Sequence, residues 1–295
     1  MNEKREILVT IGIPVYNMSN SIVAAVNSCI KQSYSNVEIL VVDDGSTDDS
    51  IDKLRNEVKD GRMRICLRGE NGGVSQAMRT IVNEAKGEYI CFLDADDTMM
   101  SDRVEKQLES IFSVKKRHPD RMVASFCGSL VNDLYNKTRY ELYPEDLWNR
   151  RASHRFGEGT GHSMYKTADL RKLGNFDPAF NRSSDAAMCI TFLMNGGIYA
   201  MMRECLITYN LCFDEKKQRI GKKERFLFRK LAVEIRSLEL NNFYLNRFLE
   251  SFEPKKRFVC KLFNKIPIIS LIKDREVVRI NLFGLPLIKI EMRDE

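Results

Sequence analysis

The sequence predicts an α/β fold in which helices flank a mixed or parallel β-sheet. Three observations predict this fold. Short apolar runs alternate with segments of helical periodicity over the first hundred residues, the second run is continuous enough to be buried on both faces, and three of the first four runs end in polar, turn-forming residues. With 295 residues, 43% of them hydrophobic, the chain can form one large domain or two ordinary ones.

The first four predicted strands are short and apolar. They are expected at residues 7–13, 37–43, 63–67 and 89–93, and Pro14 is expected to bound the first of them. The polar sequences PVYN, DDGS and DADD follow the first, second and fourth strands. Ligands of an open parallel sheet bind beyond the carboxyl ends of its strands, so three such turns together predict a site, although each alone is more often only a surface turn.

Three helices are expected between these strands. The first follows Ser19 or Asn20, and the second follows Thr47, because each of these side chains can cap a helix and apolar residues then recur at helical spacing. The third helix is expected from about Val74 to Ala85. This order of elements is typical of a parallel sheet.

The fourth strand ends in three carboxylates within four positions, Asp94, Asp96 and Asp97. Carboxylates this close repel one another, and burying them costs free energy unless a cation or a strong hydrogen-bond donor compensates their charge. A helix N-terminus would accommodate one or two of them but not three. The sequence therefore predicts a positively charged partner at this turn.

The segments VTIGIPVYN, QSYSNVEILVVDDGSTDDS and ENGGVSQAMRTIVNEAKGEYICFLDADD resemble successive signatures of family 2 glycosyltransferases, which have the GT-A fold. The resemblance is nearly gapless from residue 7 to about 97 and continues more weakly to about 210. It implies a Rossmann-like sheet flanked by helices and a chain of three parts. Residues 1–100 would bind a nucleotide-sugar, residues 101–215 an acceptor, and residues 216–295 would form a helical and then β-like extension.

The resemblance implies a divalent cation, Mn²⁺ or Mg²⁺, at the aspartate turn. Such an ion neutralises the charge that builds on a departing nucleoside diphosphate, and both ions prefer oxygen ligands. Asp96 is expected as a metal ligand and Asp94 as a contact to the ribose or the metal. The positive partner of the carboxylates would thus arrive with the substrate.

The resemblance also implies how a nucleotide is held. Asp44, with Asp43 beside it, would accept the N3–H of a uracil, and Tyr16 would stack on the base, although Tyr16 could instead cover the sheet edge. Many relatives have Ala-Arg-Asn where this chain has Ala-Met-Arg at residues 77–79. In this chain, Arg79 is expected to reach a phosphate of the donor. The further donor-side residues that the resemblance implies are Pro14, Asn17, Asn71 and Gly73.

An inverting transfer needs a general base for the acceptor hydroxyl. The segment around GNFDPAFNRSSDAAM resembles the acceptor side of the family, where an acidic residue at the start of a helix is the base. This residue is Asp185 here. The alternative is that Asp185 only stabilises the helix N-terminus through its charge. His162 and Arg182 are expected to contact the acceptor or a phosphate. Many relatives have a later metal-binding His that this chain lacks, so Asp214 or water would take that place.

The C-terminal extension is basic. Lys and Arg outnumber Asp and Glu two to one between Lys216 and Glu295, and a helix is expected at about residues 222–252. The alternation of basic and apolar residues that follows resembles the ends of bacterial glycosyltransferases acting on lipopolysaccharide or capsule. It implies peripheral contact with an anionic membrane, whereas the alternative is a small β extension with ordinary surface lysines. We expect no nucleic-acid partner, because the extension lacks a recognised motif.

The sequence thus predicts an inverting, non-processive enzyme that moves a sugar from a UDP-sugar or related donor to a glycan or glycolipid of a bacterial surface polysaccharide. The processive relatives' QxxRW motif is absent, and no GxGxxG follows the first strand, which argues against a nicotinamide-dependent oxidoreductase. The alternative is a catalytically silent nucleotide-sugar-binding or scaffold protein. The N-terminus has no signal-peptide pattern, so we expect a cytoplasmic protein, at most peripheral to the inner membrane.

Overall fold

The computed structural model describes residues 7–144, 161–180 and 184–211, together with four strands at residues 257–262, 266–274, 277–282 and 285–291. The chain divides into two compact units, Met1–Leu245 and Asn246–Glu295. Three sequence expectations lie outside the described residues: the acceptor contact Arg182, the metal ligand Asp214 and the helix at 222–252.

The described part of the first unit alternates strands and helices. Its strands are β1 (Val9–Val15), β2 (Val37–Asp43), β3 (Met63–Leu67), β4 (Tyr89–Phe92), β5 (Thr98–Met99), β6 (Val123–Asp133), β7 (Thr138–Leu142), β8 (Ser163–Lys166) and β9 (Ile198–Leu211). Its helices are α1 (Ile22–Ile30), α2 (Ser50–Glu57), α3 (Val74–Glu84), α4 (Arg103–Arg117), α6 (Thr167–Lys172) and α7 (Ser184–Met194), with a 3₁₀ turn, η2, at Pro178–Phe180. The predicted α/β fold class is confirmed.

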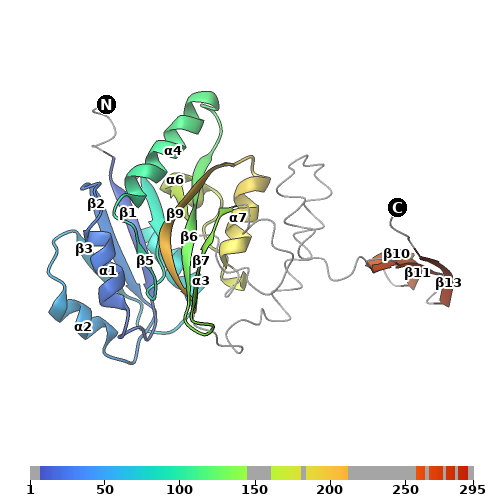
Figure 1. The fold of residues 1–295 in the computed structure, drawn as a ribbon, viewed down its shortest axis with the longest axis horizontal. Coiled ribbons are helices and arrows are strands. Elements are labelled where there is room, and N and C mark those ends of the chain that lie inside the picture. Colours follow the sequence, from blue (N-terminus) through green and yellow to red (C-terminus); the bar gives the residue numbers. More distant parts are fainter. Residues whose placement is uncertain are drawn as a thin grey trace. The chain divides into compact units, whose positions relative to one another are not determined.

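The strands form one mixed sheet in the order β3-β2-β1-β4-β8-β6-β9-β5, with β7 paired to β6. Strands β1 to β4 are mutually parallel, β8 runs antiparallel to both β4 and β6, and β9 runs parallel to β6. Figure 1 shows α1 and α2 at the end of the sheet that holds β2 and β3, and α4 along β6 and β9. Because β1 to β4 are parallel, the turns that follow them meet at one edge.

Helices cover both faces of this sheet, and β2 shows why its sequence has no polar face. Ile39 and Val41 pack in one cluster with residues of α1, α2 and α4, whereas Leu40 and Val42 pack in another with residues of α3, α6 and α7. All seven residues of β2 are buried, as expected for a strand covered on both sides. The core therefore fixes the strand ends from two directions.

Pro14 does not bound β1, which was expected to end at residue 13. The strand continues to Val15 and pairs with β2 as far as Val15 and Asp43. Pairing of β1 with β4 ends earlier, at Gly12, whose carbonyl accepts from the Leu93 N–H at 3.0 Å. Since Pro14 lies two residues further on, its nitrogen faces the side where the ladder has ended, and its missing N–H costs no ladder bond.

The described strands of the second unit form an antiparallel meander. They are β10 (Arg257–Leu262), β11 (Ile266–Asp274), β12 (Val277–Leu282) and β13 (Leu285–Glu291), in that order in a four-stranded sheet. A β extension was predicted for this region. Among the residues that the structure describes, none forms a helix long and apolar enough to cross a bilayer.

A buried carboxylate network ties the amino ends of the strands together, opposite the edge where the turns meet. Glu38 accepts hydrogen bonds from Thr10 Oγ1 (2.7 Å), the Lys86 N–H (2.9 Å) and Arg64 Nη2 (2.9 Å). Burial alone would raise the pKa of Glu38, but these donors outweigh it and hold the pKa below its ordinary value. The charged form of Glu38 therefore stabilises the folded state.

Replacing Glu38 with glutamine is expected to lower the free energy of unfolding at neutral pH by about 2–4 kcal/mol, because an amide N–H₂ would face donors in a buried site. The folded-state pKa of Glu38 lies below the unfolded value of 4.5, so its stabilisation is complete above about pH 4.5 and is lost as the pH falls through the folded pKa. Urea titrations of the wild type and of Glu38→Gln at a series of pH values would measure the difference in their free energies of unfolding.

The matched control is Glu84→Gln. Glu84 also contacts Arg64, at 3.2 Å, but its side chain is half-exposed, and we expect a loss below about 1 kcal/mol. The difference in stability between the wild type and Glu38→Gln should narrow in acid. A difference that stays constant or widens below about pH 4 would refute the assigned charge of Glu38.

Candidate active site

A cleft of about 600 Å³ lies at the carboxyl edge of β1 to β4, where the strand-end turns meet. Each of the first four strands contributes to it through the residues that follow or end it. The lining residues are Pro14, Val15, Tyr16, Asn17, Met18, Asp44, Asn71, Gly73, Val74, Ala77, Asp94, Ala95 and Asp96. Eight of the ten residues expected on the donor side are in this lining, and the exceptions are Asp43 and Arg79.

The turn after β1 offers an aromatic ring to this cleft. Tyr16 is 42% exposed, so its ring is available to a ligand. Asn17 adopts a positive φ of 54° and its side-chain oxygen accepts from the Thr47 N–H at 2.8 Å and the Asp48 N–H at 3.3 Å. Asparagine tolerates this backbone conformation, and its amide ties the turn after β1 to the turn after β2.

The two acids at the end of β2 have different surroundings. The carboxylate of Asp43 accepts from the Ser46 N–H at 3.2 Å and is absent from the cleft lining, so it closes its own turn. Asp44 is buried, lines the cleft and accepts from the Gly73 N–H at 2.7 Å and from Arg68. Asp44 therefore anchors the glycine loop before α3, and this contact fixes the carboxylate at the cleft wall.

The aspartate turn after β4 faces the same cleft. Asp94 and Asp96 both line it, and the Asp97 N–H donates to the Asp94 carbonyl at 3.0 Å, which closes the turn. Burial and the neighbouring charges of Asp96 and Asp185 raise the pKa of Asp94 to about 8. The turn thus disfavours the charged form of Asp94, and a bound cation would favour it.

The third carboxylate of this turn is turned toward β9. Asp97 is 4% exposed, and its Oδ1 accepts the Asn210 N–H at 2.8 Å. The sequence left Asp97 without a distinct role. This contact explains why three acids occur together, because one of them supports the turn while Asp94 and Asp96 line the cleft.

A buried arginine behind the turn was missed by the sequence analysis. The guanidinium of Arg103 is fully buried and donates to the carbonyls of Phe92 (3.1 Å) and Gly161 (2.6 Å) and to Gln107 Oε1 (3.0 Å). Its charge lowers the pKa of Asp94, although burial and the two carboxylates outweigh it. An arginine at the first position of a helix is ordinary in sequence, so only its burial reveals this role.

Asp185 lies in the first turn of α7, as predicted, and Ser184 Oγ donates to its Oδ1 at 3.4 Å. Its charge contributes to the raised pKa of Asp94, which indicates that the two carboxylates lie near each other. The structure therefore brings the expected base near the aspartate turn, although the two are about ninety residues apart in sequence.

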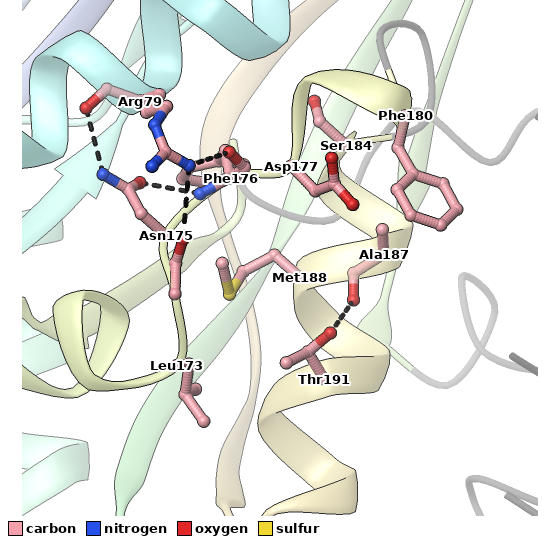
Figure 2. Close-up of a pocket in the computed structure, with 11 residues that line it drawn as sticks. Arg79, Leu173, Asn175, Phe176, Asp177, Phe180, Ser184, Ala187, Met188 and Thr191 are labelled. Carbon is pink, nitrogen blue, oxygen red and sulfur yellow. Dashed lines mark hydrogen bonds between the residues drawn. The ribbon is translucent and has the colours of Figure 1, made fainter. Parts of the chain in front are cut away.

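Arg79 lies apart from the donor cleft, in a second pocket of about 350 Å³ (Figure 2). Its Nη1 donates to the carbonyls of Gly174 (3.3 Å) and Phe176 (3.1 Å), and Asn175 Nδ2 donates back to the Arg79 carbonyl at 3.1 Å. Figure 2 shows the guanidinium directed at this loop from α3. A phosphate contact by Arg79 stays a prediction, while its observed partners connect α3 to the segment that leads to α7.

His162 lies beneath the aspartate turn. It is 3% exposed, its ring stacks on Phe126 with centroids 5.6 Å apart, and it shares a void of about 10 Å³ with Asp94 and Asp97. A void of this size has room for about one water molecule. The acceptor contact expected of His162 stays a prediction, because the residue does not line the donor cleft.

The donor set suits magnesium or manganese. Among the residues that the structure describes, no three His, Cys, Asp or Glu side chains gather into a ready metal site. Asp94 and Asp96 nevertheless present two carboxylates from one turn, and these ions are commonly held by one or two carboxylates, with water and substrate phosphates completing the shell. The residues therefore fit an ion that binds together with a phosphorylated substrate.

The family model for glycosyl transferase family 2 matches residues 10–174, more than half of the chain. The chain belongs to glycosyl transferase family 2. This match spans the aspartate turn and the residues that line the cleft, and it confirms the family that the sequence motifs predicted.

Relatives of this glycosyltransferase come from several bacteria. It is 30% identical over 232 residues to TuaG of Bacillus subtilis, whose name assigns it to teichuronic acid biosynthesis; the match covers 76% of this chain and 88% of TuaG. It is 40% identical over 102 residues, 34% of this chain and 40% of the relative, to the UDP-Glc:alpha-D-GlcNAc-diphosphoundecaprenol beta-1,3-glucosyltransferase WfaP of Escherichia coli. The chain spans only 41% and 60% of the length of two further curated relatives.

Solved structures share the fold. Residues 1–349 of S. aureus TarS, in complex with UDP-GlcNAc, match with a TM-score of 0.58 at 18% identity, covering 81% of this chain and 69% of that one. The mannosyltransferase PcManGT from Pyrobaculum calidifontis, in complex with GDP-Man and Mn²⁺, matches with a TM-score of 0.54 at 18% identity. This match covers 82% of this chain and 68% of PcManGT. At this identity the likeness shows the GT-A fold.

Proposed function

We propose that this glycosyltransferase transfers a sugar from a UDP-sugar to a glycan or lipid-linked acceptor, with inversion at the anomeric carbon. One observation carries the proposal: the turns after β1, β2 and β4 converge on a single cleft that presents Tyr16, Asp44 and the Asp94–Asp96 pair. Tyr16 would stack on the uracil, Asp44 would accept its N3–H, and the Asp94–Asp96 pair would hold the cation beside the diphosphate. Its volume of about 600 Å³ lies within the range of ordinary ligand sites.

In the proposed reaction Asp94 and Asp96 would hold Mn²⁺ or Mg²⁺, which would neutralise charge on the departing diphosphate. Asp185 takes the proton from the acceptor hydroxyl as that oxygen attacks the anomeric carbon. The charge of Asp185 helps to raise the pKa of Asp94, which supports a base close to the metal ligands. Buried Arg103 fixes the backbone behind the turn through Phe92 and Gly161.

The relatives support a bacterial surface polysaccharide as the product. TuaG is named for teichuronic acid biosynthesis, WfaP acts on a diphosphoundecaprenol-linked sugar, and the TarS complex contains UDP-GlcNAc. We assign donor binding to residues 1–100, acceptor binding to 101–215 and peripheral contact with an anionic membrane to the basic extension at 216–295. The choice between a hexosyl and an N-acetylhexosaminyl donor is part of the test.

The proposal is tested by incubating the protein and Mn²⁺ with UDP-glucose, UDP-galactose and their N-acetylated counterparts, with and without short diphosphoprenol-linked saccharides. We expect one donor to raise the melting temperature and to release UDP faster with an acceptor. Proton NMR of the product should show the inverted anomer. Tight UDP binding without turnover on any acceptor of this class would instead favour the silent nucleotide-sugar-binding protein.

Replacing Tyr16 with alanine is expected to weaken UDP binding by roughly 5- to 150-fold, since stacking of a base on an aromatic ring contributes about 1–3 kcal/mol. Because the ring is 42% exposed, the melting temperature of the unliganded protein should change little. Tyr16→Phe is the matched control and should bind UDP nearly as well as the wild type. Calorimetric titration with UDP measures the affinity of each variant. Equal affinity in the wild type and both variants would show that Tyr16 does not stack on the base.

A further inference from the structure

The aspartate turn is held from β9 by an unusual set of hydrogen bonds. Strand β5, which directly follows the turn, pairs antiparallel with β9, with Thr98 opposite Thr208 and Met99 opposite Ile207. Continuing this register by two residues places Asn210 opposite Asp96. Backbone hydrogen bonds between the two strands at this position would require the metal-binding turn itself to be an extended strand.

Side chains replace the backbone ladder there. The Asn210 N–H donates to Asp97 Oδ1 at 2.8 Å rather than to a backbone carbonyl, and Asn210 Nδ2 donates to the Asp96 carbonyl at 2.7 Å. The Asp97 carboxylate and the Asn210 amide therefore lie between the backbone of the turn and the backbone of β9. This spacing leaves room for the turn to close through the Asp97 N–H and the Asp94 carbonyl.

The orientation of the Asn210 amide is itself fixed. Asn132 lies opposite Asn210 on the parallel strand β6, and its Nδ2 donates to Asn210 Oδ1 at 3.0 Å. Rotating the Asn210 amide by half a turn would oppose two oxygens at Asp96 and two N–H₂ groups at Asn132. The Asn132–Asn210 pair thus admits one arrangement, in which a donor faces the Asp96 carbonyl.

We propose that Asn210 is a positioning residue for the metal-binding turn, with Asn132 as its support. It sets the distance of the turn from β9 and hence the placement of the Asp96 and Asp94 carboxylates in the cleft. Groups that orient metal ligands commonly contribute 10- to 100-fold to metal affinity or activity. This inference rests on the proposed function, because it takes Asp94 and Asp96 as the ligands.

The test compares Asn210→Ala and Asn132→Ala with the matched control Asn136→Ala. Asn136 lies in the β6–β7 turn and its Nδ2 also donates to a carboxylate, Asp133 Oδ2 at 2.8 Å, away from the metal-binding turn. Binding of Mn²⁺ in the presence of UDP is measured by electron paramagnetic resonance. We expect about 10- to 100-fold weaker binding for Asn210→Ala, a smaller loss for Asn132→Ala and no change for the control.

A second readout uses the metal-free protein. Hydrogen exchange followed by mass spectrometry should show at least about tenfold faster exchange in the peptide that contains Asp97 and Thr98 for Asn210→Ala, but not for Asn136→Ala. Wild-type exchange and Mn²⁺ affinity in Asn210→Ala would overturn the inference. If Asp96→Ala also binds Mn²⁺ as the wild type does, the proposed metal site itself fails, so the two failures are distinguishable.

Discussion

Asp96→Asn is expected to abolish sugar transfer while raising the stability of the metal-free protein. Asp96 lines the cleft, and its charge helps to raise the pKa of Asp94 to about 8, so above that pH the two ionised carboxylates repel each other when no cation is present. Losing electrostatic stabilisation of the departing diphosphate should lower kcat by about 10³-fold or more. In a chelator at about pH 9, where Asp94 is ionised, the variant should melt about 2–4 °C above the wild type, which corresponds to about 1 kcal/mol.

Asp97→Asn gives the matched comparison in the same turn. Asp97 is buried and accepts the Asn210 N–H, so its replacement should lower the melting temperature. Added Mn²⁺ and UDP should stabilise the wild type but not Asp96→Asn. An Asp96→Asn protein that keeps its activity would contradict the metal-binding role, and one that melts below the wild type in chelator at about pH 9 would contradict the repulsion assigned to this pair.

Asp185→Asn is expected to lower kcat by about 10²- to 10⁴-fold, the usual contribution of a general base. Affinity for UDP should change by less than about threefold, because Asp185 does not line the donor cleft. Measuring the rate of transfer together with calorimetric binding of UDP separates these two effects. A loss confined to kcat is the result that a base predicts.

The control for Asp185 is Asp169→Asn. Both acids stand in the first turn of a helix, Asp185 in α7 and Asp169 in α6, so both interact favourably with the helix dipole. If Asp185 were only such a charge, the two variants would behave alike. Equal activity of Asp185→Asn and Asp169→Asn would therefore remove the catalytic role.

The cleft could be predicted from sequence because its parts are local. Tyr16, Asp44 and Asp96 each follow a strand whose apolar run is easy to recognise, and parallel pairing then brings the strand ends together. The start of α7 just before Asp185 follows from the same local reading. In each case, one short segment carries the whole signal.

The support of the site could not be predicted in this way. Asn210 contacts Asp96 across 114 residues, through a pairing of β5 and β9 that no periodicity reports. Arg103 looks like a surface residue in sequence and is fully buried in the fold. Arg79 has a long side chain that can reach several groups, and the fold directs it to the loop at Gly174 and Phe176. Such contacts depend on tertiary packing.

The most direct test of the account is a calorimetric titration of UDP into the wild-type protein with Mn²⁺ and, separately, with excess EDTA. If Asp94 and Asp96 bind a cation together with the diphosphate, UDP should bind at least about tenfold more tightly with Mn²⁺, a gain of about 1.4 kcal/mol or more. The same titration of Asp96→Asn should show no gain. Equal UDP affinity in Mn²⁺ and EDTA for the wild type would contradict the central claim.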